Sequence, residues 1–275
     1  IFCNYCAEAA RIVAEGTATP AQVDRVVNEA IGGGGPFNVM DLTRGNLLNI
    51  HCLELMQHAP TGTAWFAPPP IFAQQANTPW HDAAHPGDSA CSDALRREIL
   101  DRILAVVLGR TCFVAEEGIC DPSDLNWLTR QALGFSQGLL DLAASQGAEA
   151  VHDLCTRYAA RFPGFPVPRG VAAKRLPTFL RHVRVERDGE LAVVMIRRPE
   201  VKNALSDQVM AELAESFGEL ERDATVKGIV LTSFDGALAG ADINELAALK
   251  TPAAAADKCR RGQGVLAVIA GCHKP

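Results

Sequence analysis

The chain has 275 residues, of which 48% are hydrophobic and 6% aromatic, and its formal charge is −6. This length can bury one large core or two or three smaller ones. Without a run of Lys or Arg, we expect no nucleic-acid partner. The apolar stretches are too short to span a bilayer, so we expect no membrane insertion.

Nine scattered cysteines form an odd set in a chain that is not a small secreted domain. We therefore expect reduced thiols and a cytoplasmic protein rather than a disulfide framework. The chain opens inside a predicted helix, without Met or a charged leader. We expect both ends to be internal to a longer protein.

The first part of the chain predicts an all-helical unit. An apolar stripe at helical spacing comes first: Phe2, Tyr5, Cys6, Ala9 and Val13. Gly16 ends this helix, and Thr19-Pro20-Ala21-Gln22 predicts a capping box with Pro at the first helical position. The second helix runs to about Ile31 and breaks at Gly32–Gly35.

The same succession recurs further along the chain. A second stripe has helical spacing: Leu100, Ile103, Leu104, Val107, Thr111 and Val114. Gly118 ends it, Asp121 caps the next helix ahead of Pro122, and Gly134 breaks that helix. Caps and breaks match the first unit at one constant offset, and Asp41 matches Asp141 after a two-residue deletion. We infer an internal duplication of a helical unit.

After about Arg175 the pattern becomes α/β. It predicts a β-hairpin of Val183–Glu186 and Leu191–Ile196, and a helix capped by Ser206. Gly228–Thr232 is a continuous apolar run, which predicts a strand buried on both faces. Two further helices are expected, near 244–249 and 252–270.

The predicted boundaries follow from these changes. They are a first helical unit at 1–73, a connector at 74–92, a second helical unit at 93–175, a linker at 176–181, and an α/β segment at 182–275.

Three motifs are weaker candidates for chemistry. Cys3-x-x-Cys6 has no second Cys pair at zinc spacing, so we interpret it as one helical turn rather than a metal or redox motif. His81 and His85 sit between prolines, which favours a loop over a metal site. Gly32–Gly35 lacks the strand and the Lys-Ser/Thr ending of a phosphate loop, so we interpret it as an inter-helix turn. We expect no bound metal.

A stronger candidate combines Arg198-Pro199…Asn203-Ala204-Leu205 with Ala239-Gly240-Ala241-Asp242-Ile243. Small residues after a strand let a thioester carbonyl approach the main chain, and Asp242 can cap the following helix. The Ala241 N–H would then stabilise a developing oxyanion. From composition alone, an ordinary strand-to-helix turn remains an alternative.

From Val183 to Pro275 the chain resembles the start of the enoyl-CoA hydratase/isomerase (crotonase) family, on these motifs and on Gly228–Thr232. The resemblance implies that the Ala241 N–H is one of two oxyanion-hole donors. It also implies acyl-CoA contacts at a further set of positions: Lys202, Ala204, Ala239, Asp242 and Ile243. The second donor and two catalytic glutamates would lie beyond Pro275.

The helical part resembles the C-terminal domain of 3-hydroxyacyl-CoA dehydrogenases. The first copy carries the resemblance: Glu8-Ala9-Ala10-Arg11, Gly16, Val23-Asp24, Gly35-Pro36-Phe37 and Asp41. The second copy departs from the Gly-Pro-Phe form at Gly134-Phe135-Ser136…Gly138. NAD would be held by a Rossmann domain that this chain does not contain.

Together the resemblances imply a multidomain protein: an all-α duplicated dehydrogenase C-terminal-like domain, then a truncated α/β crotonase-like domain. The implied function is fatty-acid β-oxidation, hydrating enoyl-CoA and oxidising 3-hydroxyacyl-CoA, with the isolated chain inactive and a homo-oligomer expected. An alternative is a helical scaffold or dimerisation module joined to an enoyl-CoA isomerase or a non-catalytic relative.

Overall fold

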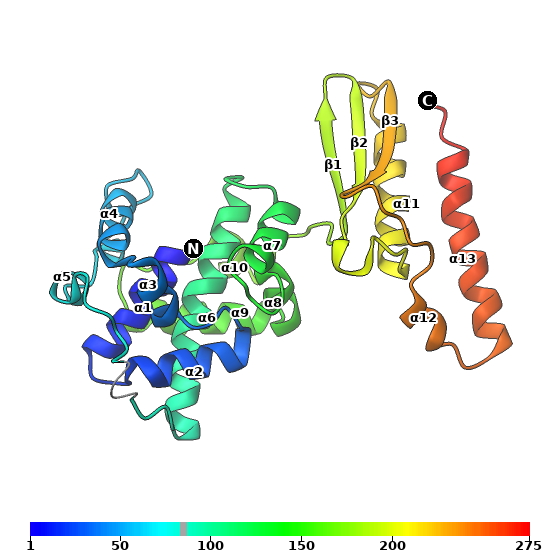
Figure 1. Cartoon of the computed structure of the whole chain (residues 1–275). Helices are drawn as coiled ribbons and strands as arrows, with labels where there is room; N and C mark the ends of the chain where they lie inside the picture. Colours follow the sequence, from blue (N-terminus) through cyan, green and yellow to red (C-terminus); the bar gives the residue numbers. More distant parts are fainter. Residues whose placement is uncertain (83–86) are drawn as a thin grey trace. The chain divides into compact units, whose positions relative to one another are not determined.

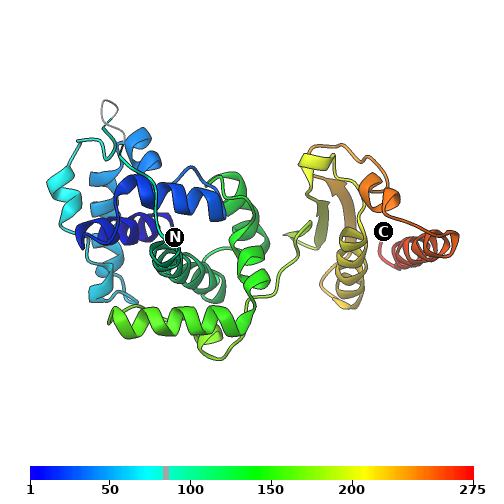
Figure 2. The same cartoon turned by 90° about the horizontal axis from the view of Figure 1, so that it is seen from below.

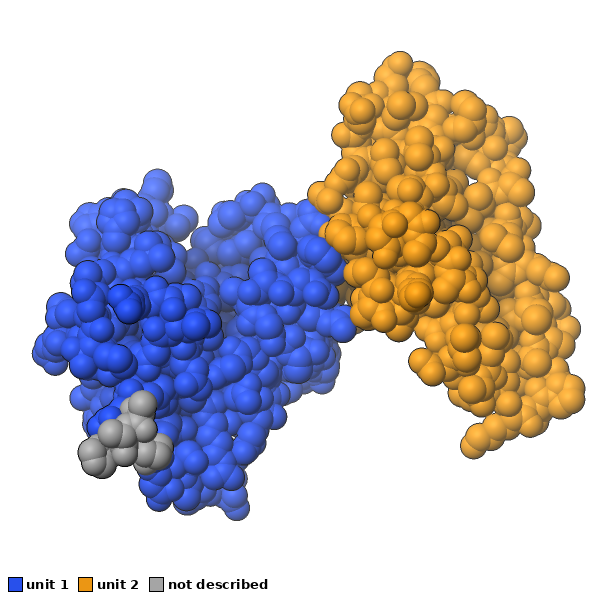
Figure 3. All heavy atoms as spheres, in the orientation of Figure 1, with its two compact units in different colours: residues 1–178 blue, residues 179–275 orange. Residues whose placement is uncertain are grey.

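The computed structural model describes residues 1–82 and 87–275. The chain divides into two compact units, residues 1–178 and 179–275, which are coloured separately in Figure 3. Each is described by itself. Within the described ranges, no helix combines the length and the apolar content needed to cross a membrane.

The first unit is all-helical. Its elements are α1 (Phe2–Ala14), α2 (Pro20–Ile31), α3 (Pro36–Thr43), α4 (Asn46–Gln57), η1 (Ala64–Phe66), α5 (Ile71–Gln75), α6 (Asp93–Glu116), α7 (Pro122–Gln131), α8 (Leu139–Gln146), α9 (Ala148–Arg161) and α10 (Arg169–Ala172). The long α6 packs against α1, α2, α8, α9 and α10, and Figure 2 views it nearly end-on among its neighbours. A single hydrophobic core therefore spans both predicted helical copies.

A buried polar network crosses this core. Glu8 on α1 is fully buried, and it accepts a hydrogen bond at 2.6 Å from Nε of Arg102 on α6. Tyr158 on α9 donates to the same carboxylate. Trp65 Nε1 lies 3.2 Å from the Tyr158 hydroxyl. Because every member is paired, the charge of Glu8 is compensated inside the core.

The predicted helix starts are confirmed. Thr19 Oγ1 accepts from the Gln22 N–H at 3.3 Å, and Gln22 Oε1 accepts from the Thr19 N–H at 3.0 Å. In the second copy Asp121 accepts from two N–H groups of α7. Gly16 and Gly118 both have positive φ, which places the two helix breaks at matching positions.

The two helical copies share a second device at their α2–α3 and α7–α8 connections. The Asp24 carboxylate accepts from the N–H groups of Phe37 and Asn38, and Asn126 Oδ1 accepts from those of Leu140 and Asp141. Asn38 in the first copy and Asp141 in the second therefore occupy equivalent positions.

The sequence-based pairing of Asp41 with Asp141 is therefore displaced. Asp41 is the sixth residue of α3, whereas Asp141 is the third residue of α8. The register of α3 against α8 follows from the shared capping bonds. An identical residue at one position of each copy is not enough to establish it.

The second unit is α/β (Figure 1). Its elements are β1 (Val183–Asp188), β2 (Leu191–Ile196), η2 (Pro199–Val201), α11 (Asp207–Arg222), β3 (Gly228–Ser233), α12 (Ile243–Ala247) and α13 (Pro252–Ala270). The sheet order is β1-β2-β3, with β1 antiparallel and β3 parallel to β2. The predicted hairpin is confirmed. Ser206 caps α11 by accepting from the Val209 N–H at 3.2 Å.

The prediction that Gly228–Thr232 is buried on both faces is wrong for the described structure. Val230 is 47% exposed and Leu231 is 43% exposed. Among the described residues β3 forms the edge of the three-stranded sheet, with β2 as its paired strand. An apolar run indicates strand propensity, but burial depends on which elements cover the strand.

Candidate functional site

Two loops of the second unit lie side by side and carry the predicted site residues except Ile243, which begins α12. One leads from η2 to α11 and contains Lys202, Ala204 and Leu205, and the other follows β3 and contains Ala239–Asp242. The Ala239 N–H donates to Lys202 O at 3.1 Å. The Leu205 N–H donates to Gly240 O at 2.7 Å, and the Asp242 N–H donates to Leu205 O at 3.0 Å. The main chain alone aligns the two loops.

This pairing brackets Ala241 and leaves its N–H free. Leu205 and Ala241 form an isolated parallel bridge, in which Leu205 bonds to the residues on either side of Ala241. In a parallel bridge of this kind the bracketed residue directs its own N–H away from the partner. Ala241 is exposed, and within residues 1–82 and 87–275 no acceptor is found for its N–H.

Asn203 holds the first loop in an unusual conformation. Its φ is +54°, in the left-handed region that Asn tolerates better than most residues, and its side chain is fully buried. Its Oδ1 accepts from the Arg198 N–H at 2.7 Å. Its Nδ2 donates to Asp235 Oδ1 at 2.6 Å and to Ala237 O at 3.0 Å. One side chain thus ties both loops together.

Arg198 and Asp242 add a charged tie between the same loops. Arg198 Nη1 donates to Ala204 O at 2.7 Å and to Asp242 Oδ2 at 3.1 Å. Asp242 also caps α12 by accepting from the Asn244 N–H at 3.0 Å. Burial raises the pKa of the Asp242 carboxyl, but the bonds from Arg198 and Asn244 outweigh it, so its pKa lies below the ordinary value.

The remaining predicted contacts differ in exposure. Lys202 is exposed and also left-handed, with φ +52°, while Ala204 is buried. Ala239 is exposed, and Ile243 is 78% exposed at the start of α12. Because α12 spans only five residues, its helix dipole adds little to the electrostatic field at Ala241.

The sequence motifs did not reveal which side chains hold the two loops in place around Ala241. Three carboxylates in the loop after β3 and in α12 are engaged by other groups. Asp235 accepts from Asn203, Asp242 accepts from Arg198, and Glu245 accepts from Lys258 Nζ at 2.6 Å and from the Asp207 N–H at 2.9 Å. These contacts span long separations in sequence, so no local pattern signals them.

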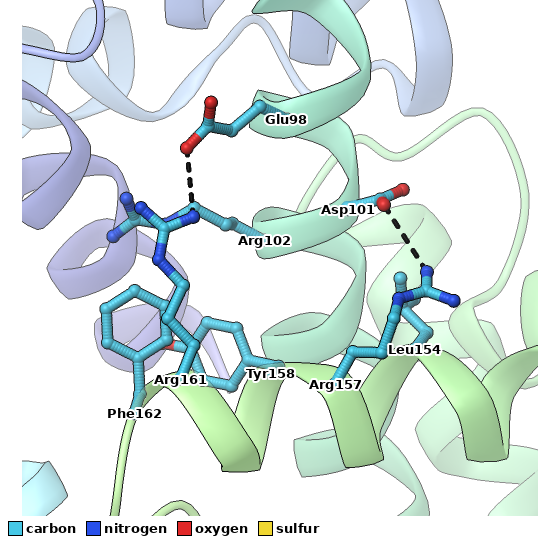
Figure 4. Close-up of a pocket in the computed structure, with 8 residues that line it drawn as sticks. All are labelled: Glu98, Asp101, Arg102, Leu154, Arg157, Tyr158, Arg161 and Phe162. Atoms are coloured by element: carbon cyan, nitrogen blue, oxygen red, sulfur yellow. Dashed lines mark hydrogen bonds and ion pairs between the residues drawn. The ribbon is translucent and has the colours of Figure 1, made fainter.

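A separate cavity of about 240 Å³ lies between α6 and α9 in the first unit (Figure 4). Its arginines point toward carboxylates: Arg161 to Glu98 at 2.9 Å, and Arg157 to Asp101 at 3.3 Å. Arg102 is held by Glu8. Because these cations are already neutralised by carboxylates, the cavity is a poor site for an anionic ligand.

The polar groups of two weaker sequence candidates are engaged inside the protein, as far as the described residues show. Gly34 N–H donates to Asn28 Oδ1, and the Asp24 carboxylate occupies the start of α3 where a phosphate would bind. His81 Nε2 lies 2.9 Å from Asp24 Oδ2, and His85 lies outside the described residues. In the described parts of the chain, no cluster of three His, Cys, Asp or Glu side chains has metal-binding geometry.

Comparison with known families agrees with this division of the chain. Residues 186–275 match the family model of enoyl-CoA hydratase/isomerase. Residues 1–84 match that of the 3-hydroxyacyl-CoA dehydrogenase C-terminal domain. The two matches thus fall on different parts of the chain, one within each compact unit.

Individual relatives match over short stretches. The short-chain-enoyl-CoA hydratase of Clostridium acetobutylicum is 38% identical over 74 residues, which is 26% of this chain and 28% of that protein. The fatty acid oxidation complex subunit alpha of Shewanella frigidimarina is 35% identical over 92 residues, which is 32% of this chain and 13% of that protein. The crystal structure of enoyl-CoA hydratase from Thermoplasma volcanium GSS1 is 39% identical, with a TM-score of 0.25. That match covers 27% of this chain and 30% of that one. The chain therefore spans well under half the length of these relatives.

Proposed function

We propose that this chain is part of a bifunctional β-oxidation enzyme that hydrates enoyl-CoA to 3-hydroxyacyl-CoA and oxidises the product with NAD. The observation that carries this proposal is the Ala241 N–H, which is exposed and has no acceptor in the described part of the chain. A preorganised donor of this kind stabilises the negative charge that develops on a thioester oxygen.

The flanking residues support an acyl-CoA substrate. Ala239 and Ala241 present no bulk beyond Cβ, so a thioester can approach the main chain between them. Lys202 and Ile243 are exposed on either side, offering a cation for a phosphate and an apolar surface for the pantetheine or adenine. Ala204 and Asp242 would contribute through the shape of the loop.

NAD belongs to the second half of the proposed reaction. The glycine-rich turn at Gly32–Gly35 is a poor nucleotide site because the N–H groups of Gly32, Gly33 and Gly34 already donate inside the protein. We therefore assign NAD to a domain outside these residues and derive no step through it.

Removing the Ala241 N–H tests the proposal. The two variants are made in the full-length protein. Ala241→Pro removes an N–H from which no described residue accepts a hydrogen bond, whereas Ala241→Gly keeps that N–H. We expect Ala241→Pro to lower kcat for crotonyl-CoA hydration by about 10²- to 10³-fold, and Ala241→Gly to stay near wild type. Circular dichroism of both variants controls for folding. Equal hydration by both variants would contradict the assignment.

The 275-residue chain alone is expected to be inactive. Three carboxylates near Ala241 in sequence, Asp235, Asp242 and Glu245, are each held by another group, so we expect none of these three to activate water. We expect no turnover of crotonyl-CoA above buffer in an absorbance assay of the thioester-conjugated double bond. Measurable turnover by this chain would refute the expectation.

A further inference from the structure

A lysine of α13 joins the two helices that lead out of the paired loops. Lys258 Nζ donates to Asp207 Oδ1 at 2.6 Å and to Glu245 Oε2 at 2.6 Å. Asp207 is the first residue of α11, and Glu245 is the third residue of α12. One ammonium group therefore links three helices.

The same cluster contains a second cation and a main-chain bond. The Asp207 N–H donates to Glu245 Oε2 at 2.9 Å, and Arg261 Nη2 on α13 lies 3.3 Å from Asp207 Oδ2. The Arg261 side chain is 57% exposed, whereas that of Lys258 is 11% exposed. Because water and salt screen an exposed ion pair, Lys258 contributes more than Arg261 to holding the cluster.

The cluster connects to both sides of the loop pairing. Asp207 lies two residues after Leu205, and Glu245 lies three residues after Asp242. Leu205 and Ala241 form the bridge that leaves the Ala241 N–H exposed, and the Asp242 N–H donates to Leu205 O. A movement of α12 relative to α11 would therefore disturb this pairing and change the direction of the Ala241 N–H.

The helix that carries Lys258 is held by little apolar surface. In the described structure none of the residues of α13 is buried. Just past its end, Lys274 Nζ donates to the carbonyls of Leu220 and Asp223 at the end of α11. The two helices thus pack side by side in the same direction (Figure 1). Since few apolar contacts hold α13, its charged contacts carry a large share of its attachment.

We propose that Lys258 is a positioning residue for the Ala241 N–H. Its bonds to Asp207 and Glu245 hold α12 against α11 and so keep the two loops in register. The inference rests on the proposed function, which assigns the Ala241 N–H as an oxyanion donor. Such a donor is effective only when its direction is fixed before charge develops on the substrate, so a loosened support lowers kcat.

Amide exchange in the 275-residue chain tests the positioning role without any assay of activity. Lys258→Met removes the charge and keeps a long side chain. Lys250→Met is the matched control, because Lys250 is exposed and no described residue accepts a bond from its ammonium group. We expect exchange of the Leu205 and Asp242 amides to become about tenfold faster in Lys258→Met and to stay unchanged in Lys250→Met.

The amides of the β1–β2 ladder report whether the rest of the second unit stays intact. We expect their exchange to be the same in Lys258→Met and in wild type. Unchanged exchange of the loop amides in Lys258→Met would overturn the proposal. An equal acceleration in the loops and in the ladder would also overturn it, since Lys258 would then stabilise the whole unit rather than the loops.

Crotonyl-CoA hydration by the full-length protein measures the consequence for the reaction. We expect Lys258→Met to lower kcat about tenfold and to leave KM within about twofold, and Lys258→Arg to retain most of kcat. A wild-type kcat in Lys258→Met, a change in KM alone, or an equal loss in Lys258→Arg would overturn the inference. Absence of hydration by the wild-type protein would instead contradict the proposed function, and amide exchange would still decide whether Lys258 holds the loops.

Discussion

At the scale of single residues, the predicted site is an exposed N–H held in place by buried side chains of its own two loops. Asn203 and Arg198 each bond to both loops, and Asp242 joins the second loop to α12. The sequence predicted Asp242 as a cap because a cap and its N–H lie within a few residues. It did not reveal the Arg198–Asp242 tie, because the partners are distant in sequence and meet only after folding.

Asp242 predicts a measurable pH dependence. Since the folded-state pKa of Asp242 lies below its ordinary value of 3.8, its stabilising contribution is present above pH 3.8 and is lost as the pH falls through the folded-state pKa. Asp242→Asn keeps a capping side chain but not the charge. Urea unfolding at several pH values should show a stability gap between wild type and Asp242→Asn at pH 7 that closes in acid. A difference in the free energy of unfolding that stays constant with pH would contradict a role for the charge of Asp242.

At the scale of elements, the two helical copies share helix starts and connections but differ in chemistry. Asp24 and Asn126 perform the same capping task, yet only Asp24 can ionise and bind His81. Helix starts were predictable because Thr19–Gln22 and Asp121 act locally. The register of α3 against α8 and the exposure of β3 were not predictable from the sequence, since both depend on neighbouring elements.

Gly35 tests the connection between α2 and α3. Its φ is +89°, and an added Cβ would lie 2.5 Å from Asp24 Cγ, whereas Gly34 has φ +75° and open space around it. Both Ala substitutions introduce backbone strain, and at Gly35, whose ψ is 147°, the conformation is one that essentially only glycine adopts, so the strain there is about 1–3 kcal/mol. We expect Gly35→Ala to lower the free energy of unfolding by a further ~1–3 kcal/mol through the clash. Denaturant unfolding compares them, and equal losses would show that Asp24 yields without cost.

At the scale of the whole molecule, the second unit exposes large apolar side chains on both faces of β3 and in the loop after it: Val230, Leu231, Phe234 and Leu238. Exposed apolar surface of this kind favours association. We expect sedimentation velocity to show concentration-dependent self-association that Leu231→Lys weakens. Ile119→Lys, at an exposed apolar position of the first unit, is the control. Monomeric behaviour at every concentration would rule out the expected homo-oligomer.

The loop pairing around Ala241 also bears on how the site can change over time. The proposed oxyanion donor belongs to the main chain, so an alanine scan would pass over it, and many small side chains could replace Ala241 without loss of that N–H. Selection would act instead on the neighbours that keep Leu205 opposite Ala241. Variation at position 241 is therefore a poor guide to whether the site is still functional, while loss of Asn203 or Arg198 is a better sign of its decay.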